Sequence, residues 1–561
     1  MAIVSLVLVS ASVGLCADAR VTPGDWARYT FLLARRDAKP SVKEVLLTVG
    51  PREKNLWWWE MAVEKPDGSA FTVRALSERV PMVGSGGDIG RVHRYLLKEG
   101  SRPFMDYRDK ASGGPLLPGF DFRTQLLPQP TPGSPFDGVF ATTGTCIGGA
   151  VQLMETGHGK PLADAGETKL VSLDPTLIVG TGRCFRDTDD GRVTGRDYSY
   201  RPFRPEEYDE MEAAGVNFFI VDGAERESWV RERPAFYTKA PVFEDFPNIL
   251  YRSNYRGMTM FMDEPAILTD FSPCLHATDA ANLLRLRVAE TYASRSYYGS
   301  RALAAQLEKA GVCLGTWELV EWDIPAWEAV YAAAYHEAEG GASGVVHEGR
   351  YQAAVFNTVL NDFFGPGLEV TSEELLVLHY AFLRGAARCF NKTWGTSIYG
   401  QADPNISPLA VKKAYDMGAR YIWFWTSDHG HHVPYREQLE LTRILREHEK
   451  AHPRRPIRDL LRKPKVAVAF PEGYIGWSEF WPSGIWNNER FGFKKPNEQG
   501  VPYGSIIAAA LKAGVALARK GTEFDFVVDG EAARKAGYDR IIRIRTDGSV
   551  ENSVSASKTG R

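Results

Sequence analysis

The sequence predicts an α/β fold whose central domain is a (β/α)8 barrel, preceded by an antiparallel β domain and followed by a small α/β domain. Eight strand-like segments, with helix-like segments between them, lie between Asp174 and Asp428, which matches such a barrel in strand number and length. Polar residues gather where those strands end. The chain has 561 residues, enough for about two to four domains.

Composition and charge place the chain among ordinary globular proteins. Hydrophobic residues make up 44% and charged residues 24%, and the formal net charge is −3. Because no basic block stands out, a nucleic-acid partner is not expected. The six cysteines are widely spaced and form no CxxC pair, which excludes a zinc ribbon. We expect no cofactor.

Residues 1–19 have the pattern of a secretory signal peptide. Ile3–Leu15 is apolar, and Ala17, Asp18 and Ala19 follow as an A-x-A cleavage pattern. The stretch is too short for a transmembrane helix, and no later stretch is apolar enough to span a bilayer. The sequence therefore predicts a secreted or periplasmic protein without an integral membrane segment.

Residues 20–170 are predicted to form a sandwich-like antiparallel β domain. Its strand candidates are Trp26–Leu33, Val45–Val49, Trp57–Val63 and Phe71–Ala75. The last two flank a Pro-Asp-Gly turn and are expected to form a hairpin. Two of the three tryptophans at positions 57–59 are expected in the sheet core. Residues 113–135, rich in Pro and Gly, are expected to form a loop.

Residues 171–452 are predicted to form the barrel. The strand candidates are short apolar runs bounded by turn residues, and they are Thr176–Gly180, Asn217–Asp222, Asn248–Ser253, Gly257–Asp263, Val312–Glu318, Ser343–Glu348, Trp394–Gly400 and Tyr421–Asp428. Helices are expected over Arg204–Gly215, Ala280–Ser294, Pro325–Glu339 and Glu373–Arg388, and from Ser407 onward.

Residues 453–545 are predicted to form the small α/β domain. Three strand candidates, Lys465–Phe470, Phe524–Val528 and Arg540–Ile544, accompany a helix over Ile506–Arg519. The polar residues 546–561 are expected to be disordered.

Active-site residues of a parallel barrel lie at the carboxyl ends of its strands. The residues at the predicted strand ends are Asp222, Asn254, Asp263, Glu264, Trp322, His347, Glu348, Arg350, Tyr399, Gln401, Asp403, Trp425, Asp428 and His429. Cleavage of a glycosidic bond needs one carboxyl group that protonates the leaving oxygen and a second that attacks the anomeric carbon or activates water. The strand ends therefore predict a glycosidase acting on an oligo- or polysaccharide, with aromatic faces for the sugar rings.

The fourth strand candidate ends in Asp263, Glu264 and Pro265. This ending resembles the Asn-Glu-Pro ending of the fourth strand in clan A glycoside hydrolases, where the glutamate is the acid/base and the asparagine contacts the sugar 2-hydroxyl. The resemblance implies that Glu264 is the acid/base. Asp263 replaces the asparagine, and an ionised Asp only accepts hydrogen bonds, which puts its sugar contact in doubt.

The domain order is similar to that of the family 42 β-galactosidases, in which a TIM barrel precedes a flavodoxin-like trimerisation domain. Lys465–Phe470 and the Ala-rich helix after Tyr503 resemble the start of that domain. The resemblance covers about residues 175–545 and implies an exported O-glycosyl hydrolase. By analogy it also implies a homo-oligomer, a trimer.

The position of the second carboxylate differs between this sequence and that family. Clan A enzymes carry the nucleophile glutamate at the end of strand seven, where residues 399–403 contain no glutamate. Glu348 after strand six is the leading candidate, with His347 and Arg350 as neighbours that would hold it. Asp403 or Asp428 could take the role instead. The remaining interpretation is a barrel that binds glycans without cleaving them.

The segment Asp428–His432 contains one carboxylate and three histidines. Neutral imidazoles with a carboxylate suit zinc or iron, so a barrel metallohydrolase is a further alternative, with metal-activated water as the nucleophile. Metal-dependent barrels draw their ligands from several strands, however, and His347 is the other strand-end histidine. We therefore expect histidines that bind sugar hydroxyls, such as His429, and no metal site.

Overall fold

The structure is a computed structural model of the chain, and its described residues form two compact units. The first unit ends at Ser172 and the second begins at Leu173. The predicted signal peptide, residues 1–19, lies outside the described residues. The residues that the structure describes are 21–33, 41–64, 70–80, 92–100, 103–109, 126–130, 138–143, 148–162, 164–165, 169–173, 176–181, 184–188, 199–238, 264–294, 326–328, 331–340, 342, 344–364, 368–426, 431–453, 460–462, 464–478, 481 and 483–554.

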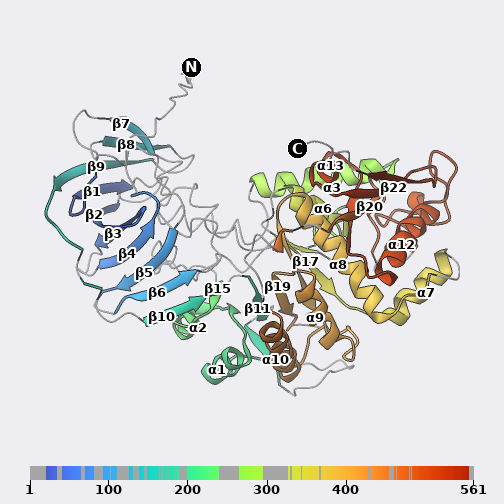
Figure 1. Cartoon of the computed structure of the whole chain (residues 1–561), viewed down its shortest axis with the longest axis horizontal. Coiled ribbons are helices and arrows are strands. Elements are labelled where there is room, and N and C mark those ends of the chain that lie inside the picture. The colour runs from blue at the N-terminus through green and yellow to red at the C-terminus, as the bar shows by residue number, and fades with distance from the viewer. Residues whose placement is uncertain are drawn as a thin grey trace. The chain divides into compact units, whose positions relative to one another are not determined.

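The first unit contains a ten-stranded sheet in the order β10-β6-β5-β4-β3-β2-β1-β9-β8-β7 (Figure 1). Its strands are β1 Trp26–Leu33, β2 Ser41–Glu53, β3 Leu56–Glu64, β4 Ala70–Ser77, β5 Val92–Glu99, β6 Met105–Asp109, β7 Leu126–Pro130, β8 Gly138–Thr143, β9 Gly148–Gly157 and β10 Lys169–Leu173. Strands β1 to β9 pair antiparallel, and β3 and β4 form the predicted hairpin.

Two details of this unit differ from the sequence prediction. The described strands form one sheet, where the prediction was a sandwich, and β7 lies within the segment that we expected to be a loop. The prediction for the tryptophans is confirmed, because Trp57 and Trp59 are buried on one face of β3 while Trp58 is half-buried on the other.

The second unit contains a seven-stranded parallel sheet in the order β15-β14-β11-β19-β18-β17-β16. Its strands are β11 Ile178–Thr181, β14 Phe218–Ile220, β15 Phe236–Thr238, β16 Ala326–Glu328, β17 Gly344–Gly349, β18 Thr393–Ile398 and β19 Tyr421–Phe424. The five of these that the sequence predicted are β11, β14, β17, β18 and β19. The fold is therefore a mixed α/β fold with one parallel and one antiparallel sheet of large size.

Two short strands correct the sequence prediction. β15 lies in a segment for which no strand was expected, and β16 occupies the start of the predicted helix Pro325–Glu339, so that the helix itself, α6, begins only at Tyr331. The predicted strands at 248–253, 257–263 and 312–318 lie outside the described residues.

The helices of this unit cover one face of the parallel sheet. They are α1 Pro205–Ala214, α2 Gly223–Val230, α3 Ala277–Ser294, α6 Tyr331–Gly340, α7 Ala353–Phe364, α8 Ser372–Cys389, α9 Ser407–Asp416 and α10 Tyr435–Ala451. Val345 of β17, Trp394 of β18 and Ile422 of β19 belong to one hydrophobic core with residues of α3, α6, α7, α8, α9 and α10. Because side chains alternate along a strand, the residues between them face the other side of the sheet.

The C-terminal segment forms a second, four-stranded sheet in the order β21-β20-β22-β23. Its elements are β20 Val466–Phe470, α12 Tyr503–Arg519, β21 Phe524–Val528, α13 Glu531–Lys535, β22 Arg540–Ile544 and β23 Val550–Val554. The three parallel strands have the 2-1-3 order of flavodoxin-like sheets. The expectation of disorder is wrong for residues 550–554, because β23 pairs antiparallel with β22.

This second sheet shares a hydrophobic core with α8 of the same unit. Phe382 of α8 stacks on Phe526 of β21, with ring centroids 4.3 Å apart. A Cβ atom on Gly385 would lie only 1.9 Å from the carbonyl oxygen of Phe526, so glycine is what allows the helix backbone to lie against the strand. The segment that we predicted as a separate domain therefore packs as part of the second unit (Figure 1). No helix within the described residues has the length and apolar content that crossing a bilayer requires.

Glu207 of α1 binds the two-stranded sheet formed by β12 Phe185–Asp187 and β13 Tyr200–Pro202. Its carboxylate accepts hydrogen bonds from Arg186 at 3.0 Å, from Arg201 at 2.8 Å and from the backbone N–H of Arg204 at 2.8 Å. Burial alone raises the pKa of this carboxyl group, but these donors and the charges of Arg201 and Arg186 outweigh burial. The pKa of Glu207 is therefore lowered.

The lowered pKa of Glu207 predicts acid sensitivity. A carboxyl group with a folded-state pKa below its unfolded value, about 4.3, stabilises the fold above that value and loses this contribution as the pH falls through the folded pKa. Between about pH 6 and about pH 3, the Tm of Glu207→Gln should therefore fall less steeply than the Tm of the wild type. Parallel curves of Tm against pH for the two proteins would contradict this assignment.

Candidate functional site

Glu348 lies at the carboxyl end of β17, on the face of the sheet opposite the helices. Its neighbour His347 points the other way, as the alternation of a strand requires. Across the ladder Glu348 is paired in register with Ser397 of β18, which in turn pairs with Trp423 of β19. Only 7% of the Glu348 side chain is exposed. A carboxylate this buried needs partners.

Two side chains hold the Glu348 carboxylate. Arg350 donates from Nη2 to Oε2 at 2.9 Å, and the hydroxyl of Tyr399, just beyond β18, donates to Oε1. Arg350 also donates from Nε to the side-chain oxygen of Gln401 at 3.1 Å and lies over the Tyr399 ring at 5.5 Å. Four residues that the sequence singled out, from two adjacent strands, are thus brought together as one hydrogen-bonded group, which we call the Glu348 cluster.

Trp425 extends this cluster with an aromatic surface. Its ring stacks on Tyr399 with centroids 5.4 Å apart and an interplanar angle of 5°. The backbone N–H of Trp425 donates to Ile398 and its carbonyl accepts from Val433, which fixes the segment after β19 beside the end of β18. The result is a half-buried tryptophan next to a buried carboxylate, at one edge of a parallel sheet.

Gly400 allows the chain after β19 to approach the cluster. Its N–H donates to the carbonyl of His431 at 2.6 Å, and a Cβ atom at this position would lie 2.2 Å from the carbonyl oxygen of His432. The ring of His431 consequently lies 6.2 Å from that of Tyr399. Any larger residue at position 400 would push the two segments apart.

The role that the sequence suggested for His347 is not what the structure shows. His347 is buried on the helix side of β17, where its ring lies 5.7 Å from that of His379 of α8. Burial, and after it the neighbouring His347, lowers the pKa of His379. His347 therefore belongs to the packing layer between sheet and helices, whereas Arg350 does contact Glu348 as expected.

Asp222 and Asp403 are engaged in local contacts. Asp222 precedes α2, is 62% exposed and forms an ion pair with Arg226 at 2.5 Å. Asp403 accepts from the backbone N–H of Asn405 at 2.9 Å, and its carbonyl accepts from Ser407 at the start of α9. Such contacts define turns before helices. Neither residue shares a hydrogen bond or ion pair with Glu348.

Glu264 begins the described segment 264–294, and its backbone has φ +45°. This left-handed conformation is uncommon for a residue other than glycine and persists only where the surroundings impose it. Tyr351, three residues after Glu348, has a similar φ of +42°, is fully buried and shares a hydrogen bond with Thr396. Strain of this kind concentrates at functional sites, and here it occurs beside both proposed carboxylates.

The segment that follows Glu264 is fixed by the long connection between β20 and α12. Asn488 donates from Nδ2 to the carbonyl of Phe271 at 2.7 Å, and the Phe271 ring lies 5.0 Å from that of Trp486. Farther along, Nδ1 of His276 lies 2.7 Å from the carboxylate of Glu498. The C-terminal part of the chain therefore positions the stretch that starts with the proposed acid.

Several predicted site residues lie outside the described part of the chain, namely Asn254, Asp263, Trp322, Asp428 and His429. Of the histidine-rich segment, His432 is described and buried, with its Nδ1 3.5 Å from the hydroxyl of Tyr200. Among the residues that the structure does describe, no three His, Cys, Asp or Glu side chains are grouped as a metal site requires.

The structure adds Ser397 and Gln352 to the site. Ser397 is fully buried, and its hydroxyl has no hydrogen-bond partner among the residues described. Adjacent strands are about 4.8 Å apart, so this hydroxyl lies close to Glu348. Gln352 donates to the backbone carbonyl of Gln401. Ser397 could have been found from the sequence, because it lies two residues before Tyr399 on the same face of a strand.

No protein-family model matches the sequence, and no curated protein is significantly similar to it.

Proposed function

We propose that the protein hydrolyses O-glycosidic bonds, with Glu348 as the nucleophile or general base and Glu264 as the general acid. The observation that carries the proposal is the Glu348 cluster, a buried carboxylate at the carboxyl end of a parallel strand beside the stacked pair of Tyr399 and Trp425. A glycosidase needs a carboxylate of this kind and a surface for the apolar face of a sugar.

The contacts of Glu348 favour one of the two carboxylate roles. The guanidinium of Arg350 and the hydroxyl of Tyr399 both donate to the Glu348 carboxylate, so its two oxygens act as hydrogen-bond acceptors. Such a carboxylate suits attack on the anomeric carbon or activation of water. The proton for the leaving oxygen must then come from a second carboxyl group, and we assign it to Glu264.

The proposal includes a closed barrel. β11 and β19, the first and last long strands of the parallel sheet along the chain, are neighbours, as they would be in a closed barrel. The described order ends at β15 on one side and at β16 on the other. One further strand between these two edges would close the barrel, and Gly257–Asp263 is the segment of suitable pattern. The eight strands would then be β11, β14, β15, 257–263, β16, β17, β18 and β19. Glu264 and Glu348 would follow strands separated only by β16.

Two further expectations belong to the same proposal. Residues 1–19 would direct export to the periplasm or the outside of the cell, as their A-x-A pattern suggests. The 2-1-3 order of the C-terminal sheet is compatible with a flavodoxin-like domain of the family 42 kind, and by that analogy the protein would assemble as a trimer. The size of the protein in solution tests the latter directly.

A glycan-binding protein without hydrolytic activity is the second candidate. The observation that favours it is that each oxygen of the Glu348 carboxylate already accepts a hydrogen bond, from Arg350 and from Tyr399. A carboxylate committed to structure would leave the stacked Tyr399 and Trp425 as a binding surface alone.

A panel of aryl glycosides and polysaccharides distinguishes the two candidates. The enzyme proposal expects release of the aryl group or of reducing sugar from at least one member of the panel, and loss of this release in Glu348→Gln. Binding of a glycan without turnover, with equal affinity in the wild type and in Glu348→Gln, would support the binding protein instead. The anomeric form of the first product separates retention from inversion.

A further inference from the structure

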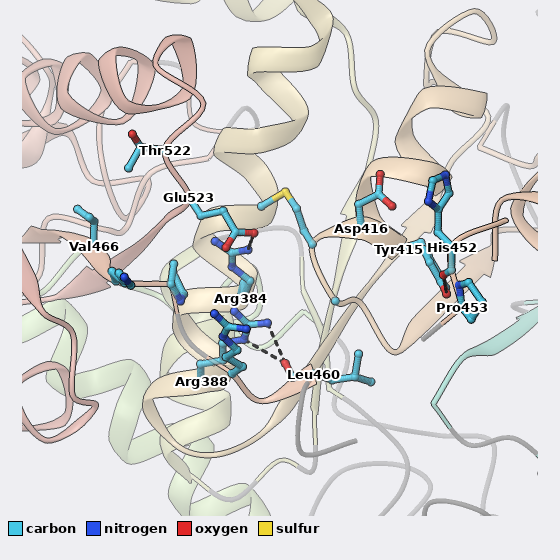
Figure 2. Close-up of a pocket in the computed structure, with 15 residues that line it drawn as sticks. Arg384, Arg388, Tyr415, Asp416, His452, Pro453, Leu460, Val466, Thr522 and Glu523 are labelled. Atoms are coloured by element: carbon cyan, nitrogen blue, oxygen red, sulfur yellow. Dashed lines mark hydrogen bonds and ion pairs between the residues drawn. The ribbon is translucent and has the colours of Figure 1, made fainter. Parts of the chain in front are cut away.

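A cavity of about 700 Å³ lies in the second unit, away from the Glu348 cluster (Figure 2). It is bordered by the residues that precede β20 and β21 and by those that precede β19. These are the amino ends of the strands, whereas Glu348 lies at a carboxyl end. Its volume falls in the range of small-molecule sites, about 300–1,000 Å³.

The wall of this cavity contains two arginines of α8 with different surroundings. Arg384 is paired, because it donates from Nε to the fully buried Asp525 at 2.6 Å. Arg388, one turn farther along the helix, is 5% exposed, and among the described residues it donates to the carbonyl of Leu460, at 3.2 Å from Nε and at 2.8 Å from Nη2. Figure 2 shows both guanidinium groups and the bonds to Leu460. No carboxylate of the described residues forms an ion pair with Arg388.

A buried guanidinium without a counter-ion is unfavourable. Burial, and then the charge of Arg384, lowers the pKa of Arg388 to about 10, so the group still carries its charge at neutral pH. The charges of Asp525 and Glu523 act on Arg388 in the opposite sense, but neither carboxylate forms an ion pair with it. A buried charge that lines a cavity and has no ion-pair partner among the described residues is an argument for an anion that is bound there.

The other charged residues of the cavity wall also favour a bound anion. Arg462 and Lys465 also line the cavity, and within the described part of the chain neither has an ion-pair partner. The two carboxylates of the wall are engaged elsewhere, Asp416 with His448 at 2.6 Å and Glu523 with Arg384 at 3.5 Å. Apolar surface is contributed by Met417, Leu460 and Val466.

We propose that this cavity is a binding site for a small organic anion. Arg388, with Arg462 and Lys465, would hold the carboxylate or phosphoryl group, and the apolar wall would contact the body of the molecule. Guanidinium groups are well suited to both oxyanions because their N–H donors match the geometry of the acceptor oxygens. The site is separate from the proposed glycosidase site and does not depend on it.

Isothermal titration of the full-length protein with inorganic phosphate, phenyl phosphate and benzoate tests the proposal. We expect phenyl phosphate to bind more tightly than inorganic phosphate, because its ring covers apolar surface. Arg388→Gln should weaken the binding of phenyl phosphate by about tenfold or more. The matched control is Arg443→Gln, which removes an exposed arginine of α10 that does not line the cavity and should bind as the wild type does.

A second variant separates binding from folding. Since Arg388 also holds the carbonyl of Leu460, its replacement could disturb the local structure, whereas Arg462→Gln leaves that contact intact and should still weaken binding. Competition between benzoate and phenyl phosphate would show that one site takes both oxyanions. The proposal is overturned if the wild type binds none of the three probes at millimolar concentration, or if Arg388→Gln and Arg462→Gln both bind phenyl phosphate with wild-type affinity.

Discussion

Glu348→Gln is expected to lower kcat by at least about 10³-fold on any glycoside that the wild type hydrolyses. Glutamine has the shape of glutamate, and its single carbonyl oxygen can still accept from one of the two donors, Arg350 or Tyr399. Its amide, however, neither attacks an anomeric carbon nor takes a proton from water. The loss should therefore appear in kcat, with a smaller change in KM, because the sugar-binding surface stays in place.

The control for this variant is Glu440→Gln, which replaces a carboxylate of α10 that is 65% exposed. Its kcat should equal that of the wild type. Thermal unfolding of Glu348→Gln must also be measured, since Arg350 loses its ionic partner. A variant that is folded, unchanged in Tm and as active as the wild type would remove Glu348 from the reaction.

Asp525→Ala is expected to destabilise the second unit by about 3–5 kcal/mol. Asp525 is fully buried in the middle of β21, where it accepts from Arg384 at 2.6 Å and from the hydroxyl of Tyr538 at 2.8 Å. Alanine would leave the buried Arg384 without its nearest counter-charge, and the hydroxyl of Tyr538 would lose its acceptor. Urea unfolding at neutral pH measures the effect.

Two further variants serve as comparisons for the stability of Asp525→Ala. Glu523→Gln removes the other acid near Arg384, but this glutamate is 70% exposed at 3.5 Å, so its loss should cost at most about 1 kcal/mol. The double variant Arg384→Met with Asp525→Leu removes both charges and should be more stable than Asp525→Ala, because a buried pair can be replaced by apolar packing. If Asp525→Ala unfolds at the same urea concentration as the wild type, the pair does not contribute to holding β21 on α8.

The elements that the sequence predicted correctly are those with a long or regular pattern. α8 shows a capping box at Thr371 and Glu374 and a strongly apolar face, and its predicted bounds are within one residue of those observed. The strands β17, β18 and β19 are buried along their whole length of four to six residues, and the sequence predicted all three. Their order in the sheet, with β19 beside β11, follows from connections of the βα type.

The elements that the sequence missed are three-residue strands. β15 follows Pro234 and is too short to show any period, and β16 follows Pro325, which is a typical first residue of a helix. Three residues carry no information that separates a strand from the first turn of a helix. These two strands form because β15 pairs with β14 and β16 pairs with β17. Such pairing is a tertiary interaction, and the local sequence pattern carries no information about it.

The same distinction applies to the site. Position at the end of a strand led to Glu348, Arg350, Tyr399, Gln401 and Trp425, because a parallel sheet brings its carboxyl ends together. Adjacency in sequence led to His347, which the structure places beside His379 of α8, because neighbouring residues of a strand face opposite sides. The anion cavity was not predicted, since Arg388 and Lys465 come from segments that meet only in the folded chain.

The most direct measurement for the assigned roles is kcat/KM of Glu264→Gln and Glu348→Gln on two aryl glycosides of the same sugar, one with a dinitrophenyl and one with a methoxyphenyl leaving group. A dinitrophenolate leaves without being protonated, so it needs little help from a general acid. We predict that Glu264→Gln loses activity on the methoxyphenyl glycoside and keeps most of it on the dinitrophenyl glycoside, whereas Glu348→Gln loses both. Equal losses on the two substrates in Glu264→Gln, or full activity in Glu348→Gln, would contradict this account.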